Sequence, residues 1–158
     1  MQDHTSYLRQ AITVANAARE HGNHPFGAIL VNSAGELLLS AENTVVSDND
    51  PTAHAELNLL RHASVKYSSA ALADCTLYSS SEPCPMCASA TVWSNIRSLV
   101  FGLGMDALYQ QFGDTGDAPT LKMPSREIFK LAPWPVKVSG PLLEEEAIAS
   151  HANFWQTP

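Results

Sequence analysis

The sequence predicts an α/β domain of three layers, α-β-α, in which helices cover both faces of one mixed five-stranded sheet. Helical and strand patterns alternate along the chain, which favours layers of the two kinds of element. The 158 residues match the size of one ordinary domain. With 45% hydrophobic and 16% charged residues, such a chain can bury a full core. We therefore expect residues 1–158 to form a single domain.

The first elements are a helix and two strands. Apolar residues recur at helical spacing from Leu8 to Ala18, and Gly22 then stops a helix predicted over about residues 6–20. The continuous apolar run 26–31 is typical of a buried strand, and a Ser-Ala-Gly turn leads into a second strand over 36–41. The two strands should form a hairpin.

The middle of the chain alternates helices and strands. A loop at 48–51 delivers Thr52 as the cap of a helix with the sequence AHAELNLLRHA. A strand at 75–79, a helix from Pro85 to about residue 95 and a strand at 98–101 follow. These strand–helix–strand units should be parallel crossovers, so a ligand is expected where helix N-termini meet strand C-termini.

The last third of the chain has weaker patterns. Residues 102–134 are rich in Gly, Pro and Asp and are predicted to be irregular. A fifth strand is expected at 136–139. An amphipathic helix is expected at about 142–156, where it could cover the active site.

The charge balance disfavours nucleic acid as a partner. The net charge is −7, from nine Lys and Arg against sixteen Asp and Glu, and the densest charge run is Glu144–Glu146. A protein that grips nucleic acid usually shows a basic footprint instead. The polar start MQDHTSYLRQ does not resemble a signal peptide, and no apolar run approaches the roughly 20 residues that cross a bilayer. Three cysteines make no disulfide framework, so we expect a cytoplasmic protein without a membrane partner.

Two predicted helix starts carry metal-binding residues. In SEPCPMC, residues 81–87, Pro85 suits the first helical position, so Cys84 becomes the cap and Cys87 closes the first turn. The helix dipole there favours thiolates. His54 falls in the first turn of the preceding helix. One imidazole and two thiolates make three zinc ligands and leave the fourth position to water. Glu56 can lean toward the same point and move that water's proton.

Other interpretations of these residues remain open. A lone C-x-x-C can be a redox pair. A structural zinc site needs a fourth protein ligand, for which Cys75, His24 and His62 are candidates. None of the three lies in a paired motif, and a structural site has no use for Glu56.

The pattern H-x-E…P-C-x-x-C is the signature of zinc-dependent nucleobase deaminases, and the chain resembles the cytidine deaminase-like superfamily. DPTAHAE at 50–56 and SEPCPMC are most similar to its guanine deaminase branch, as are PFGA at 25–28 and Asn43. The resemblance is strong from about 23 to 101 and thin afterwards. It implies one Zn²⁺ per chain on His54, Cys84 and Cys87, proton transfer by Glu56, and a homodimer.

The implied reaction is hydrolytic deamination of a free base, guanine to xanthine, with release of ammonia. The resemblance implies that the base is contacted by Phe26, Asn43, the Ala55 backbone and Trp93, although each has an equally simple structural explanation. Glu82 is implied as a neighbour of the site.

Two further substrate contacts depend on a departure from the family pattern. Asp114, with Asp117 as the alternative, stands nearest to the acidic residue with which guanine deaminases read the base. Trp155 stands in the aromatic C-terminal segment and could close a pocket or pack in the core. Cytosine deaminase, tRNA adenosine deaminase and a non-catalytic zinc domain are the competing functions, and the sequence does not identify the base.

Overall fold

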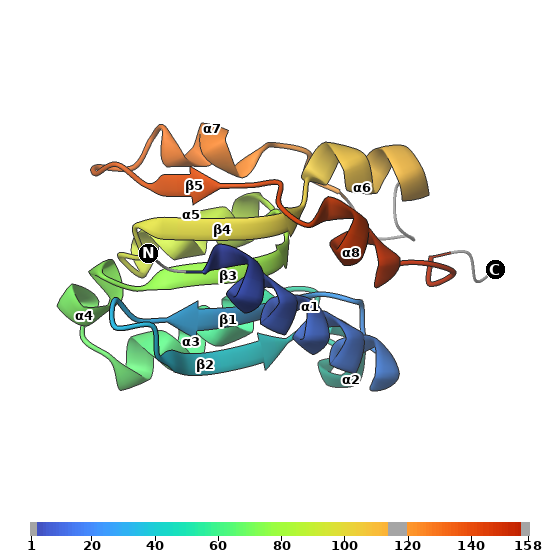
Figure 1. Cartoon of the computed structure of the whole chain (residues 1–158), viewed down its shortest axis with the longest axis horizontal. Helices are drawn as coiled ribbons and strands as arrows, with labels where there is room; N and C mark the ends of the chain where they lie inside the picture. The colour runs from blue at the N-terminus through green and yellow to red at the C-terminus, as the bar shows by residue number, and fades with distance from the viewer. Residues whose placement is uncertain (1–2, 114–119, 156–158) are drawn as a thin grey trace.

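A single sheet organises the computed structural model, which describes residues 3–113 and 120–155. Its strand order is β2-β1-β3-β4-β5 (Figure 1). The strands are β1 (Gly27–Val31), β2 (Leu37–Glu42), β3 (Thr76–Ser81), β4 (Ser98–Leu103) and β5 (Lys137–Ser139). The strand β1 pairs antiparallel with both β2 and β3, whereas β3, β4 and β5 are parallel. The predicted hairpin of β1 and β2 is therefore confirmed. The predicted crossovers from β2 to β3 and from β3 to β4 are confirmed too, because the two strands that each crossover joins run in the same direction.

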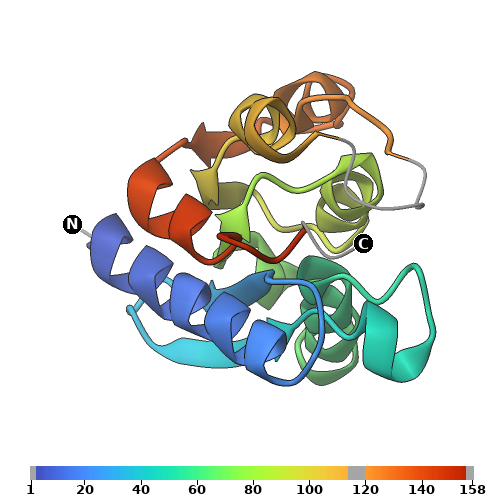
Figure 2. The ribbon, with the colours of Figure 1, turned by 90° about the vertical axis from the view of Figure 1, so that its right-hand side faces the viewer.

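Helices cover both faces of this sheet, so the predicted three-layer fold is confirmed (Figures 1 and 2). One face carries α1 and α8, and the other carries α3 and α5. The helices are α1 (His4–Glu20), α2 (Val45–Asp48), α3 (Ala55–Lys66), α4 (Ser69–Ala73), α5 (Pro85–Trp93), α6 (Met105–Phe112), α7 (Ser125–Phe129) and α8 (Glu144–Ala149).

The core is divided by the sheet into two clusters. Leu59 and Leu60 of α3 pack with Leu77 and Leu99 on one face. On the other face, α1 contacts the sheet so closely at Gly27 that a Cβ there would lie 2.4 Å from the backbone nitrogen of Ala15. Only glycine fits this position without moving α1.

Three local predictions are wrong. Residues 102–134 are not irregular throughout, because they include α6 and α7. The C-terminal helix is shorter than 142–156: α8 ends at Ala149, and turns follow. Thr52 does not cap α3, since its backbone N–H and its hydroxyl both donate to the Asp50 carboxylate, at 2.8 and 2.7 Å. The helix begins three residues later.

Within residues 3–113 and 120–155, none of the helices combines the length and the apolar character that a bilayer crossing requires.

Candidate zinc centre and active site

The N-termini of α3 and α5 meet beside the C-terminal end of β3. His54 is the cap residue of α3, and Cys84 is the cap residue of α5. Both have extended backbones, and neither side chain caps its own helix, so both remain available to a ligand. Pro85 is the first residue of α5, as predicted, and this leaves Cys87 in the first turn.

These three side chains converge on one point. The Nδ1 atom of His54 lies 3.6 Å from the Cys84 sulfur and 3.7 Å from the Cys87 sulfur. A tetrahedral zinc, with bonds of about 2.0–2.1 Å to nitrogen and about 2.3 Å to sulfur, gives a nitrogen–sulfur edge of about 3.6 Å. The donor set and its spacing therefore fit zinc.

The two thiols differ in acidity. The pKa of Cys84 is lowered to about 4, mainly because the Cys87 thiol favours its charged form and also because His54 lies beside it. The pKa of Cys87 is raised, because the Cys84 sulfur favours its protonated form and because Cys87 is buried. Burial opposes charge on His54, but Cys84 and Glu56 outweigh it and raise the pKa of the imidazole. A bound divalent cation deprotonates a coordinating thiol outright, so both sulfurs would bind it as thiolates.

Glu56 lies in the first turn of α3, buried next to the cluster. It is 5% exposed, and its Oε1 atom accepts a hydrogen bond of 2.9 Å from the Ser79 hydroxyl on β3. Burial raises the pKa of Glu56, although the charge on His54 works against this rise. A buried carboxyl with a raised pKa is suited to taking up and returning a proton near neutral pH.

No fourth protein ligand is found in the described part of the chain. There, the only His, Cys, Asp and Glu side chains with ligand atoms close enough to hold one ion together are His54, Cys84 and Cys87. The Cys75 thiol donates to the carbonyl of Ala71, His62 is exposed, and His24 stands outside the cluster. This arrangement is that of a catalytic rather than a structural zinc site.

A cavity of about 310 Å³ adjoins the cluster. His54, Glu56 and Cys84 line it, together with Phe26 and Trp155 from distant parts of the chain. The remaining lining residues are mostly apolar: His24, Val45, Pro51, Ser81, Glu82, Pro85, Met86, Leu103, Met105, Leu108, Tyr109, Thr120 and Leu121.

Among the described residues, three other predicted contacts are not part of this lining. Trp93 is 90% exposed at the last residue of α5, and a helix of nine residues places it about 13 Å from the end that carries Cys84. Ala55 is buried in the first turn of α3. Asn43 is buried, and its Oδ1 atom accepts a hydrogen bond of 3.0 Å from the backbone of Val45. Asp114 and its alternative Asp117 lie outside the described residues.

Glu82 lines the cavity and also stabilises the part of its wall that α6 and α7 form. One carboxylate oxygen accepts hydrogen bonds from the backbone and the hydroxyl of Ser125, both at 2.8 Å, and the other accepts one from the backbone of Met105 at 3.1 Å. Glu82 thereby ties the starts of α6 and α7 to the motif. This role could not be predicted from the sequence, because neither helix was expected.

His151, which the sequence analysis did not single out, anchors Trp155. The Nε1 atom of Trp155 donates a hydrogen bond of 3.0 Å to Nδ1 of His151, and the two rings are stacked with centroids 6.0 Å apart. The ring of Phe26 contacts His151 edge-on at 5.0 Å. This stack holds the indole of Trp155 at the cavity.

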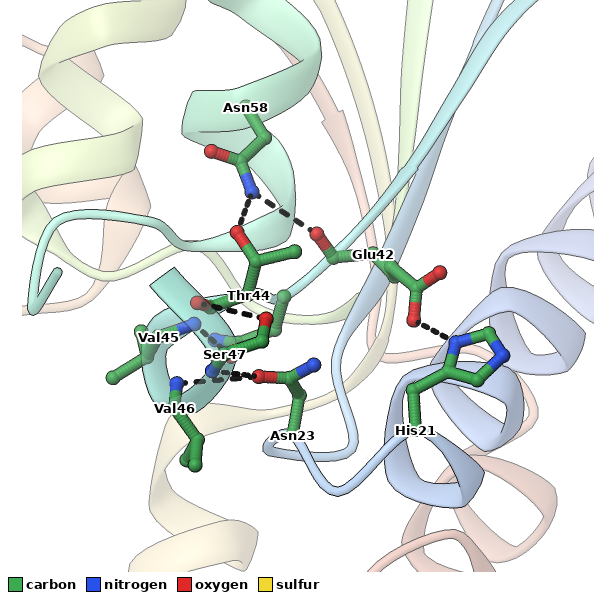
Figure 3. A network of polar contacts seen from close by, with 9 residues as sticks. His21, Asn23, Glu42, Thr44, Val45, Val46, Ser47 and Asn58 are labelled. Atoms are coloured by element: carbon green, nitrogen blue, oxygen red, sulfur yellow. Dashed lines mark hydrogen bonds and ion pairs between the residues drawn. The ribbon is translucent and has the colours of Figure 1, made fainter. Parts of the chain in front are cut away.

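A polar network fixes the start of α3 to the end of β2 (Figure 3). The Asn58 amide donates to the carbonyls of Glu42 and Ala53 and to the hydroxyl of Thr44. Since Asn58 is one turn from His54, these bonds help to place the imidazole.

Comparisons with known proteins agree with this geometry. Residues 1–103 match the family described as the cytidine and deoxycytidylate deaminase zinc-binding region. The chain belongs to this family. The resemblance stated from the motifs is thereby confirmed, and the chain is a zinc-dependent hydrolytic deaminase acting on a nucleobase or nucleoside.

Three relatives illustrate the range of substrates. A probable cytosine deaminase of Schizosaccharomyces pombe is 42% identical, over 95% of this chain and 91% of its own length. A guanine deaminase of Bacillus subtilis is 35% identical, over 79% and 81% of the two chains. A solved structure of guanine deaminase from Nitrosomonas europaea has a TM-score of 0.79 at 25% identity, over 95% of this chain and 83% of that one. These relatives support the guanine deaminase branch without settling the substrate.

Proposed function

We propose that this chain removes the exocyclic amine of a free nucleobase by hydrolysis and that guanine is the base, giving xanthine and ammonia. The observation that carries the proposal is the buried carboxyl of Glu56 beside the His54–Cys84–Cys87 triangle, at the wall of one small cavity. This combination provides a proton carrier next to an open metal position.

The chemistry divides between the metal and the protein. A zinc ion held by His54, Cys84 and Cys87 would supply an activated water at neutral pH. Glu56 transfers one proton of the attacking water to a ring nitrogen of the base and the second proton of that water to the departing amine, which leaves as ammonia. The oxygen of water stays on the carbon that loses nitrogen, so atoms balance. The positive ends of α3 and α5 point at this site and stabilise negative charge that develops there.

The cavity favours a base without a sugar. Its volume of about 310 Å³ lies at the small end of ligand pockets, which span about 300–1,000 Å³. We assign Phe26 and Trp155 to stacking on the base, because both rings line the cavity. Asn43 and the Ala55 backbone remain our proposed polar contacts on the strength of the family resemblance. The segment from α8 to Trp155 acts as the cover of the site in this proposal.

Cytosine is the second candidate, because the relative from S. pombe is named a probable cytosine deaminase and aligns with nearly the whole chain. Guanine is placed first because the relatives from B. subtilis and N. europaea are guanine deaminases and because DPTAHAE and SEPCPMC resemble that branch. We also propose a homodimer, which light scattering after size-exclusion chromatography tests directly.

The deciding experiment is ammonia release from zinc-loaded protein with guanine, adenine, cytosine, guanosine and aminated triazines. We expect the highest kcat/KM for guanine and little turnover of guanosine. A preference for cytosine would move the assignment to the second candidate. Deamination of a tRNA anticodon stem-loop with no turnover of free bases would contradict the proposal, and the net charge of −7 argues against that result.

A further inference from the structure

We infer that His24, which lies outside the deaminase motif, is a specificity-determining residue that hydrogen-bonds an edge of the bound base other than the reacting amine. The inference rests on the proposed function, because it concerns the same cavity. It extends that function by naming a polar group that selects among bases.

His24 faces the cavity from the loop between α1 and β1. It lines the same space as His54 and Glu56. Its ring lies against two aromatic rings of the C-terminal segment, with centroids 5.1 Å from Trp155 and 6.1 Å from Phe154. His24, from the N-terminal part of the chain, and Trp155, from the C-terminal part, thus lie side by side in the cavity wall.

The loop that carries His24 is held in place. The neighbouring Asn23 is buried, and its Oδ1 atom accepts hydrogen bonds of 3.2 and 3.0 Å from the backbones of Val46 and Ser47 in α2 (Figure 3). On the other side, the backbone of Phe26 donates a hydrogen bond of 2.8 Å to the carbonyl of His24. The imidazole is therefore positioned before a base arrives, which lowers the cost of binding.

The polar atoms of His24 are available to a ligand. Its side chain makes no hydrogen bond with any of the residues that the structure describes. Burial lowers the pKa of His24 and so favours its neutral form. A neutral imidazole offers one N–H donor and one nitrogen acceptor, so it can pair with a ring nitrogen, an N–H or a carbonyl of a base.

The other polar side chains of the cavity wall are less suited to contact a base. Both Glu82 oxygens accept hydrogen bonds from α6 and α7. The Ser81 hydroxyl has no hydrogen-bond partner among the described residues, but protein atoms enclose it, and Tyr109 and Thr120 each have an interaction of their own. His24 combines a place in the cavity wall with ring nitrogens that make no hydrogen bond to the described residues.

The test compares His24→Phe, which keeps the aromatic contacts with Trp155 and removes both nitrogens, with His24→Gln, which keeps a donor and an acceptor. His62→Phe, on the exposed face of α3, is the matched control. Each zinc-loaded protein is assayed with its best base and with analogues that each lack one ring nitrogen or the carbonyl oxygen. An unpaired buried polar group predicts a loss of about 10- to 100-fold in kcat/KM for His24→Phe, chiefly through KM.

Three results together support the inference. His24→Gln recovers part of the lost kcat/KM, His62→Phe matches wild type, and wild type and His24→Phe become equal on one analogue, the one that lacks the contacted atom. Unchanged kcat/KM in His24→Phe, or an equal loss on every analogue, overturns it. Loss of bound zinc in both His24 variants also overturns it, because His24 would then be a metal ligand.

Equilibrium binding separates this inference from the proposed function. Calorimetry of the same compounds with Glu56→Gln protein, with and without His24→Phe, needs no turnover. If wild type deaminates no free base but binding still depends on His24, the inference stands and the proposed function fails. If no base binds, or binding is the same in both proteins, the inference fails whatever the activity.

Discussion

Replacing His151 with Phe should flatten the pH dependence of stability between pH 7.5 and pH 5. His151 is 1% exposed, and its Nδ1 atom must stay unprotonated to accept the hydrogen bond from Trp155. Burial, with a smaller effect of the Arg19 charge, lowers the pKa of His151 to about 4. Phenylalanine keeps the ring stack and removes the titrating group.

The expected magnitude follows from the two pKa values. In the unfolded chain His151 titrates near 6.5, so as pH falls below this value the unfolded state binds a proton that the folded state refuses until about pH 4. The free energy of unfolding therefore falls with pH, by about 2 kcal/mol at pH 5 relative to pH 7.5. The variant lacks this contribution, but it loses the Trp155 hydrogen bond, about 1 kcal/mol, at every pH.

Urea unfolding of zinc-loaded wild type and His151→Phe, followed by tryptophan fluorescence from pH 7.5 to 5, measures both effects. Wild type should be the more stable protein at pH 7.5, and the difference should vanish or reverse at pH 5. Two curves that stay parallel across this range would refute the reasoning, because the buried imidazole would then titrate alike in both states.

Three further predictions concern the site and its support. Glu56→Gln should lower kcat by about 10²- to 10⁴-fold while metal analysis still finds one zinc per chain; normal turnover would exclude proton transfer by this residue. Glu82→Gln should lower the free energy of unfolding by about 1–3 kcal/mol, because the amide nitrogen cannot accept the hydrogen bonds that one carboxylate oxygen accepts from Met105 or Ser125. Denaturant titration checks this, and an unchanged midpoint would contradict the role of Glu82 in holding α6 and α7. Gly27→Ala should cost about 1–3 kcal/mol or more because α1 must shift at Ala15; thermal melting would show no change if the contact were loose.

The convergence of His54, Cys84 and Cys87 could be predicted from the sequence because local chemistry fixes the helix starts that carry them. Pro85 can occupy only the first helical turn without losing a hydrogen bond, so Cys84 had to be the cap. The start of the helix that carries His54 was harder to predict. Asp50 competes for the polar groups of Thr52, which moved the start of α3 to Ala55 and made His54 its cap.

The walls of the cavity were not predictable in the same way. The helix α6 starts after Gly104 without a side-chain cap, and α7 has only five residues. Tertiary hydrogen bonds to Glu82 fix the starts of both helices, and no local sequence pattern predicts these bonds. Similarly, the hydrogen bond between His151 and Trp155 depends on the turns that follow α8, where a longer helix was expected.

Trp93 ends α5 with an exposed ring, outside the lining of the described cavity, and its contact with the base stays a prediction from the family resemblance. His24 could not be predicted as a cavity residue, since no motif contains it and only the fold brings it into the same cavity wall as Glu56.

Zinc X-ray absorption spectroscopy of the purified protein tests the central claim most directly. We expect one nitrogen, two sulfur and one light oxygen ligand, which correspond to His54, Cys84, Cys87 and an open position filled by water. A spectrum with four nitrogen or sulfur ligands would show a closed structural site and would contradict hydrolysis at this centre.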